Sequence, residues 1–350
     1  MSAIREPQQD EEIQASLHKL ERENRILRKK LARCEANRKT MEEAKDQYDT
    51  VFQSVIRELD EQKELLGQKN QELEVLSAKL SIAKERMETE LNVGREIQMS
   101  MVPQKFPAFP DREEFDVYAT LQPAREVGGD LYDYYFLDKD RLCFCIGDVS
   151  GKGVPAALFM AMTKTLIKSR SVDDYSTASI VTHVNDALGE DNPQSMFVTL
   201  FLAILNVRTG ELLYTNAGHN PSYIRRRSGS VEALKELHGP IVGAMPGLAY
   251  KESSMLLGAG DTMLLYTDGV TEAMNKEGEF YSDPRLDGLV DRTSFESTQQ
   301  LTETVMADVV AFEDGADRAD DITILALCFN GTSKSGSINQ TVNNIQTEIS

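Results

Sequence analysis

The first hundred residues carry a hydrophobic repeat that a long helix satisfies and a globular fold does not. Residues 8–102 contain no proline and only two glycines, Gly67 and Gly94. Alternate steps of four and three residues from Ile13 to Met87 reach 22 positions, of which 17 are apolar, without a change of register. A sustained period of 3.5 residues is typical of a left-handed coiled coil, because it keeps one stripe turned toward a partner helix.

We therefore expect residues 11–90 to form one rod of about 120 Å, at 1.5 Å per residue. An isolated helix would leave so narrow an apolar stripe in water, and the simplest remedy is the same segment of a second chain, which gives a homodimer. Asn24 is in phase with the stripe, where a buried Asn can fix register and strand number. The repeat does not decide between parallel and antiparallel chains. The polar residues at in-phase positions are Asn24, Arg38, Lys45, Gln62 and Lys69.

Two interpretations of the rod remain open: a spacer that only dimerises the protein, or a signalling helix whose register or twist an activating protein alters. A DNA-binding basic region at 25–33 (RILRKKLAR) is disfavoured, because this stretch carries positions of the repeat itself and its flanks are acidic. The chain has 57 acidic and 38 basic residues, and residues 91–350 account for −16 of the net charge of −19. Because phosphate backbones attract basic surfaces, nucleic acid is excluded as the main partner.

The repeat loses its apolar character at residues 91–104. Gly94, Ile97 and Met101 are in phase with the stripe, and Pro103 ends the helical pattern. Glycine is less favourable than alanine inside a helix by about 1 kcal/mol. We predict a switch helix here, with these three in-phase residues acting as a hinge between the rod and a globular domain.

From residue 105 to residue 330 the pattern changes to short apolar runs bounded by Gly, Asp and Asn, which are typical of strands. Meandering strands with a few helices predict an α+β domain rather than repeated βαβ units. Cys143 and Cys145 are expected to pack on one face of a strand. The polar segments 1–10 and 331–350 are expected to be disordered. The predicted strands are 115–122, 130–138, 141–150, 196–207, 211–218, 221–227, 261–270 and 321–329, and the predicted helices are 154–169, 174–189 and 296–312.

The sequence contains no signal for a membrane or for export. No apolar run approaches the roughly 20 residues of a membrane span, and the first twelve residues, MSAIREPQQDEE, lack the apolar core of a signal peptide. The four cysteines are irregularly spaced and include no CxxC pair, which favours a reducing compartment. We expect a cytoplasmic protein with no membrane span.

Aspartates at the ends of apolar strands are the strongest chemical signal. Four stretches share this design: GGD at 128–130, GDVSG at 147–151, TDG at 267–269 and DDIT at 320–323. Each alone is an ordinary turn or helix cap, but if the strands converge, four or five carboxylates share one cleft. Such a cluster repels itself unless a cation neutralises it, and oxygen ligands without His or Cys indicate Mg²⁺ or Mn²⁺. Two such ions could share a carboxylate and activate a water.

Five longer motifs contain or accompany these aspartates: VGGDLYD (127–133), GDVSGKGVPAAL (147–158), NAGHNP (216–221), YTDGVTEA (266–273) and ADDITIL (319–325). In this order and spacing they resemble the SpoIIE/RsbU-type serine phosphatases, a bacterial branch of the metal-dependent PPM phosphatases. The resemblance covers about residues 95–330, since REIQMSMVPQ at 95–104 is similar to the helix that enters that domain. It implies an α–β–β–α sandwich, two antiparallel sheets flanked by helices, with two Mn²⁺ or Mg²⁺ ions at one end.

The resemblance also implies roles for the matching residues. Asp148 is the expected bridging ligand of both ions, and the Val149 carbonyl is a second contact. Asp130 is expected to serve the second ion, directly or through water, while Asp268 and Asp320 hold the first. The implied reaction is a single-step hydrolysis, in which an activated water attacks the phosphorus of phosphoserine in line and no phospho-enzyme forms.

Other positions are assigned less firmly. Asp321 stands where relatives often have Asn, so we expect it to lie behind the ligands. Ser150 stands where the wider PPM group carries a His two residues after the bridging Asp, which leaves the general acid unassigned. Arg125 and Lys152 either bind the substrate phosphate or are surface cations. For His219, a buried structural role is favoured over direct catalysis. The remaining supporting positions are Gly129 and Asn216.

The leading hypothesis is a metal-dependent protein-serine phosphatase regulated through the coiled coil. By resemblance, its substrate is a phosphorylated STAS-type anti-anti-sigma factor, which after dephosphorylation captures an anti-sigma kinase and so releases a sigma factor. Two alternatives remain: a non-catalytic coiled-coil scaffold with a phosphatase-like domain, and a metal-dependent phosphoesterase for small molecules.

Overall fold

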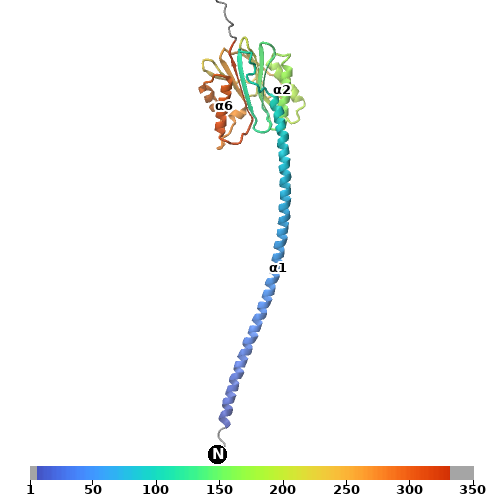
Figure 1. Cartoon of the computed structure of the whole chain (residues 1–350), viewed down its shortest axis with the longest axis vertical. Coiled ribbons are helices and arrows are strands. Elements are labelled where there is room, and N and C mark those ends of the chain that lie inside the picture. The colour runs from blue at the N-terminus through green and yellow to red at the C-terminus, as the bar shows by residue number, and fades with distance from the viewer. Residues whose placement is uncertain (1–5, 332–350) are drawn as a thin grey trace, which may run out of the picture. The chain divides into compact units, whose positions relative to one another are not determined.

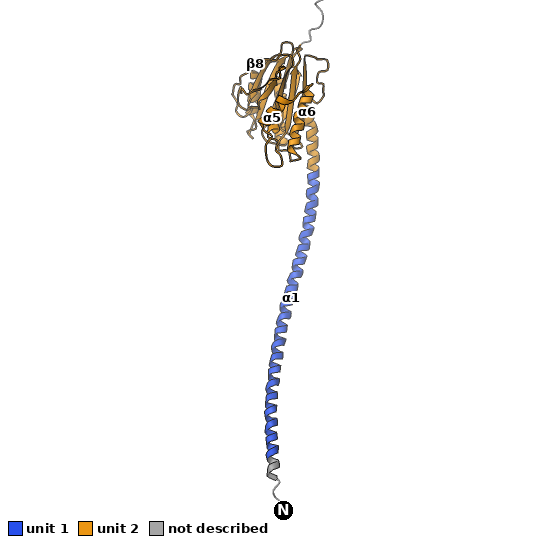
Figure 2. Cartoon of the chain, turned by 90° about the vertical axis from the view of Figure 1, so that its left-hand side faces the viewer, with its two compact units in different colours: residues 1–85 blue, residues 86–350 orange. Residues whose placement is uncertain are grey.

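The computed structural model describes the backbone of residues 6–331 and the side chains of residues 11–331. The chain divides into two compact units, residues 1–85 and residues 86–350, which Figure 2 colours separately. Residues 6–10 are helical, although the segment 1–10 was expected to be disordered. The predicted tail, apart from Gly331, lies outside the described residues, as do residues 1–5.

One helix, α1 (Glu6–Met101), forms the described part of the first unit and enters the second without a break (Figure 1). The apolar residues of the predicted stripe are exposed: Leu20, Leu59 and Leu80 have 61%, 59% and 68% of their surface in solvent. The chain therefore buries few apolar side chains of this helix against its own residues. Since isolated helices gain most of their stability from packing an apolar face, this stripe fits a coiled coil.

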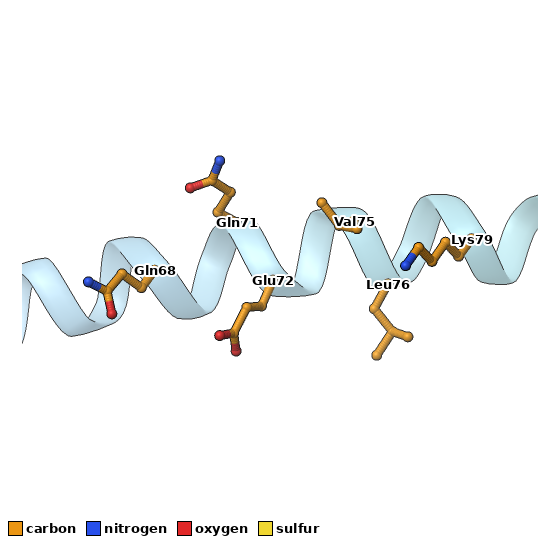
Figure 3. Close-up of a pocket in the computed structure, with 6 residues that line it drawn as sticks. All are labelled: Gln68, Gln71, Glu72, Val75, Leu76 and Lys79. Carbon is orange, nitrogen blue, oxygen red and sulfur yellow. The ribbon is translucent and has the colours of Figure 1, made fainter.

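The surface of α1 at residues 68–79 contains a shallow hollow but no ligand cavity. All the side chains that line it belong to this one helix (Figure 3). Gln71 and Val75 project from one side of the helix, and Glu72 and Leu76 project from the opposite side. Val75 and Leu76 are both more than half exposed, so the hollow is the uncovered surface of a helix.

The second unit contains two five-stranded antiparallel sheets. The first has the strand order β1-β10-β9-β6-β7, and the second has the order β2-β3-β4-β5-β8. The strands are β1 (Phe115–Gln122), β2 (Leu131–Phe136), β3 (Arg141–Val149), β4 (Val198–Asn206), β5 (Glu211–Ala217), β6 (Ser222–Arg225), β7 (Val231–Leu234), β8 (Ser253–Leu256), β9 (Asp261–Tyr266) and β10 (Ile322–Phe329), and the helices are α2 (Val154–Arg170), α3 (Thr177–Glu190), α4 (Asp268–Thr271), α5 (Asp283–Arg292) and α6 (Thr298–Glu313).

Helices cover both outer faces of the paired sheets. One apolar cluster, which includes Phe144 and Leu325, fills the space between the sheets. A second cluster joins α2 and α3 to the second sheet, and a third joins α5 and α6 to the first sheet. Figure 1 shows α2 and α6 on opposite sides of the sandwich. The predicted α–β–β–α architecture is therefore confirmed.

Burial explains which elements were visible in the sequence. β9 is buried along its whole length, because it has a helix layer on one side and the other sheet on the opposite side. All eight predicted strands and all three predicted helices are present, and Cys143 and Cys145 are both buried in β3. The short strands β7 and β8 and the helices α4 and α5 were not predicted, and residues 268–270, predicted to continue a strand, belong to α4. Among the described helices, none is long and apolar enough to cross a membrane.

Candidate metal centre

The antiparallel register brings the four aspartate motifs to one edge of the sandwich. In the second sheet, Leu131 at the start of β2 pairs with Gly147 near the end of β3, which places Asp130 beside Asp148. In the first sheet, Tyr266 at the end of β9 pairs with Ile324 near the start of β10. Asp268 therefore follows the end of β9, and Asp320 precedes the start of the neighbouring strand β10.

The carboxylates perturb one another electrostatically. Burial, followed by the charges of Asp268 and Asp320, raises the pKa of Asp148 to about 7. Burial, followed by the charges of Glu272 and Asp320, raises the pKa of Asp268 to about 6. The pKa of Asp130 lies well above its usual range because the group is buried and faces Asp148. These side chains thus form one cluster of unbalanced negative charge.

Asp130 is held by hydroxyl groups from the opposite sheet. The Oγ1 atoms of Thr267 and Thr323 donate to Asp130 Oδ2 at 2.7 and 2.6 Å. Thr267 Oγ1 in turn accepts the backbone N–H of Thr323 at 3.0 Å. These bonds therefore tie Oδ2 of Asp130, which precedes a strand of the second sheet, to residues of the first sheet. The other oxygen takes no part in them.

Asp321 turns its carboxylate onto the loop before Asp130. Its Oδ1 accepts the N–H of Ala124 at 2.8 Å, and its Oδ2 accepts the N–H of Gly129 at 2.7 Å. A Cβ added to Gly128 would lie only 2.0 Å from Asp321 Oδ2, so this approach requires glycine. The carboxylate of Asp321 thus positions the loop. That Asp321 lies behind the metal ligands and is not itself a ligand remains our prediction.

Gln98, near the end of α1, contacts the same loop. Its side chain is buried; Nε2 donates to the Gly128 carbonyl at 2.6 Å, and Oε1 accepts the Gly128 N–H at 3.1 Å. The predicted hinge residues behave differently: α1 continues through Gly94, and Ile97 and Met101 are 56% and 43% exposed. Gln98 is therefore a side chain of α1 that hydrogen-bonds the loop of Asp130.

The residues around Asp148 are fixed by backbone and side-chain contacts. Ser150 Oγ accepts the N–H of Phe197 at 2.9 Å, so this hydroxyl joins β3 to the start of β4. The Val149 carbonyl lies against Gly129, since a Cβ added there would be 2.8 Å away. The geometry brings Val149, Gly129 and Asp130 together, as a shared site requires.

His219 lies behind this cluster. It is buried, with Nδ1 at 2.9 Å from the Oγ1 of Thr199, the residue paired with Asp148 in the β3–β4 register. Burial lowers the pKa of His219 to about 4. Asn216 holds the loop by accepting the His219 N–H at 2.8 Å and donating to its carbonyl at 3.1 Å. These contacts are those of a neutral, supporting imidazole.

The two cations named in the sequence analysis differ in their surroundings. Arg125 is exposed on the loop before Asp130, and no described residue forms an ion pair with it. Lys152 Nζ lies 2.8 Å from Asp320 Oδ2. Only Lys152 is therefore in contact with a predicted ligand.

The donor set fits a hard divalent cation. Oxygen atoms of carboxylates and a carbonyl are the ligands that Mg²⁺ and Mn²⁺ prefer, and the raised pKa values mark negative charge that a cation would neutralise. Across residues 11–331, no three acidic, histidine or cysteine side chains are grouped closely enough to hold a metal ion as they stand. The carboxylates would therefore have to move closer together to bind an ion.

Several contacts that build the site were missed in the sequence analysis. Thr267 and Thr323 stand inside the recognised motifs YTDGVTEA and ADDITIL, so a signal for them was present. Gln98 stands in the entering helix, but its contact with Gly128 joins residues 30 positions apart and has no local signature. The pairing of Lys152 with Asp320 is also a product of tertiary structure.

Comparisons with known proteins agree with this geometry. A family model for stage II sporulation protein E (SpoIIE) matches residues 138–330. The chain is 31% identical over 268 residues to protein IcfG of Synechocystis sp., covering 69% of this chain and 42% of IcfG. It is 28% identical over 243 residues to the phosphoserine phosphatase RsbU of Bacillus subtilis, covering 69% of this chain and 71% of RsbU.

The fold also matches a solved structure. The SiaA-PP2C domain of Pseudomonas aeruginosa has a TM-score of 0.62 at 23% identity, covering 71% of this chain and 98% of that domain. The chain spans less than half the length of IcfG, but the family model covers more than half of this chain, from the end of β2 to the end of β10. This chain belongs to the SpoIIE family, with a phosphatase-type sandwich preceded by a long coiled-coil helix.

Proposed function

We propose that this chain is a metal-dependent protein-serine phosphatase that acts in the cytoplasm. The observation that carries the proposal is the cluster of Asp130, Asp148, Asp268 and Asp320 at one edge of the sandwich, where burial and mutual repulsion raise the pKa of Asp148 to about 7. None of the predicted ligand aspartates is replaced. The similarity to the phosphoserine phosphatase RsbU supports phosphoserine as the group that is hydrolysed.

In this proposal the aspartates and the Val149 carbonyl hold two Mn²⁺ or Mg²⁺ ions. When bound, such ions supply an activated water and stabilise negative charge on the phosphoryl oxygens. The chain supplies the positioning: Thr267 and Thr323 fix one oxygen of Asp130, and Asp321 fixes the loop before it. Ser150 Oγ accepts the N–H of Phe197, and in this proposal its role is to hold the end of β3.

For the substrate we propose phosphoserine on a STAS-type anti-anti-sigma factor, in a partner-switching pathway that controls a sigma factor. The test is release of phosphate by the full-length protein from a phosphorylated STAS-domain protein, with Mn²⁺ and with a chelator. Mn²⁺-dependent release supports the proposal. Hydrolysis of small phosphate esters alone would favour the phosphoesterase, and binding without any turnover would favour the scaffold.

We also propose that α1 forms a parallel homodimer. The exposed stripe of the rod is continued in phase by Ile97 and Met101. Beside them lies a hollow of ≈ 440 Å³, lined mainly by apolar residues such as Val127 and Leu158. One partner helix could cover the stripe and its continuation, and the in-phase Asn24 suits a parallel pair in register.

Cys34 allows a direct measurement of this arrangement. It is exposed and in phase with the stripe, so a parallel dimer places the two Cys34 thiols face to face. In a Cys328→Ser background, mild oxidation should give a covalent dimer in more than half of the chains, detected on a non-reducing gel. The added change Cys34→Ser should abolish it, since Cys143 and Cys145 are buried. A monomer in sedimentation at micromolar concentration, or a dimer that does not cross-link, would contradict the parallel pairing.

The activating signal is proposed to pass from α1 to the metal centre through Gln98. The change Gln98→Ala removes two buried hydrogen bonds to Gly128 and should cost about 1–3 kcal/mol in the ordering of that loop. We expect roughly tenfold lower phosphatase activity and weaker Mn²⁺ binding, measured by phosphate release and by calorimetry.

Gln68→Ala, an exposed glutamine on the same helix, is the matched control and should leave both values unchanged. Gly94→Ala tests the hinge: its new Cβ would lie 3.6 Å from Val127 Cγ1 without a clash, and should stiffen the junction and alter basal activity. Wild-type activity in both Gln98→Ala and Gly94→Ala would show that this segment does not transmit the signal.

A further inference from the structure

Lys152 stands on a loop between two glycines at the edge of the carboxylate cluster. It lies between β3 and α2, flanked by Gly151 and Gly153, whose φ angles are +85° and +75°. A Cβ added to either glycine would meet nothing within 4 Å. The loop backbone at these positions therefore has open space around it and a conformational range that other residues lack.

The Lys152 side chain reaches from the second sheet to the first. Its ammonium lies 2.8 Å from Asp320 Oδ2 and also donates to the Ala319 carbonyl, both in the loop before β10. Its side chain is 41% exposed and that of Asp320 is 32% exposed. The positive charge of Lys152 also offsets part of the repulsion at Asp268. One partly exposed cation thus lies across the carboxylate cluster at its solvent side.

A second cation in the loop before β10, Arg318, binds other residues. Arg318, two residues before Asp320, forms a two-pronged ion pair with Glu313, with Nε and Nη2 at 3.1 and 2.9 Å from its two oxygens. Its Nη1 donates to Gln122 Oε1 at 2.9 Å. Arg318 is committed to fixing the loop, and Arg125 contacts no predicted ligand among the described residues, so Lys152 is the cation that an ion at Asp320 would displace.

We propose that Lys152 is an exchangeable counter-cation of the metal centre, a role that rests on the proposed phosphatase function. Lys152 and a divalent cation compete for the same oxygen, Asp320 Oδ2, and their like charges repel each other. With an ion held at Asp320, the Lys152 ammonium would lose this partner and be released. A released ammonium with three N–H donors is a point-charge ligand for phosphate. Lys152 then binds the phosphoryl group of the substrate, and the product phosphate, at the mouth of the site.

The experiment uses the full-length protein and two ligands, Mn²⁺ alone and inorganic phosphate added to the Mn²⁺-loaded protein, both measured by calorimetry. Removing a partly exposed ion pair and a nearby positive charge in Lys152→Gln should tighten Mn²⁺ binding about three- to tenfold. The same variant should bind phosphate about three- to tenfold more weakly. Lys152→Arg, which keeps the charge, should recover most of both values.

Lys276→Gln is the matched control, because Lys276 forms an exposed ion pair with Asp314 at 3.2 Å and no contact with the cluster. It should bind both ligands as the wild-type protein does. Unchanged or weaker Mn²⁺ binding by Lys152→Gln would overturn the exchange, and unchanged phosphate binding would overturn the phosphate role. Absence of Mn²⁺ binding to the wild-type protein would instead overturn the proposed function, and this inference with it.

Discussion

The change Asp148→Asn should lower Mn²⁺-dependent phosphate release by on the order of 1,000-fold or more. Asp148 is the last but one residue of β3, within the carboxylate cluster, and is the expected ligand shared by both ions. Asparagine has nearly the same shape but carries no charge, so it weakens the hold on both ions. Turnover of a phosphorylated STAS-domain protein and Mn²⁺ titration are the two measurements, and we expect both to fall in this variant.

A loss of folding is not expected to explain that result. Burial and the charges of Asp268 and Asp320 raise the pKa of Asp148 to about 7, so its charge at neutral pH opposes folding of the metal-free protein. In a chelator, Asp148→Asn should therefore melt no lower than the wild-type protein. It should also retain the phosphorylated substrate in a pull-down.

The matched control for this variant is Asp291→Asn, which removes one exposed carboxylate from α5. It should keep wild-type turnover and wild-type Mn²⁺ binding. Turnover of Asp148→Asn near that of the wild-type protein would refute the proposed site.

The second large effect is expected at Lys164, which pairs with Asp133 beneath α2. Their side chains are only 12% and 5% exposed. The change Lys164→Met leaves the Asp133 carboxylate buried without its partner, which typically costs about 3–5 kcal/mol. For a domain of this size, the melting temperature should fall by roughly 6–20 °C. Because β2 starts directly after Asp130, the activity should fall as well.

Near-ultraviolet circular dichroism can follow this melting, since ten of the eleven tyrosines lie after residue 101 and report on the sandwich. The control is Lys168→Met, one turn further along α2, whose ammonium lies over the ring of Tyr135 at 5.1 Å from the centroid. It should cost about 1 kcal/mol or less. The double variant Asp133→Leu with Lys164→Met should recover most of the stability, because no buried charge remains. A single Lys164→Met variant as stable as wild type would contradict this account.

The fold was largely predictable because local patterns and tertiary environment agree. The run DTMLLY in β9 is apolar throughout, and the strand is indeed buried on both faces. The strands that were missed are short and mixed: SSML in β8 alternates between half-buried and exposed residues, as suits an outer strand. The helix α5 was missed although Asp283 and a proline open it, because its ten residues contain few apolar positions.

The site was predictable in its residues but not in its contacts. The aspartates were visible because each one follows or precedes an apolar strand beside a turn-forming residue. The hydrogen bond from Thr323 to Asp130 joins residues 193 positions apart, and the ion pair of Lys152 with Asp320 joins residues 168 positions apart. No local pattern specifies such pairs, because they depend on how the two sheets face each other.

The sequence by itself determined the rod and most strands and helices of this protein. A period of 3.5 residues specifies a helix with one apolar stripe, and apolar runs ending at Asp and Gly specify strands and their ends, because both patterns act through neighbouring residues. Only the tertiary structure decided which strand ends meet. The sheet order places Asp130 and Asp148 opposite Asp268 and Asp320, and it leaves Asp321, Gln98 and the two threonines to hold them. Side chains so distant in sequence can act on one another only after the sheets have packed, since electrostatic repulsion and hydrogen bonding act over a few ångströms.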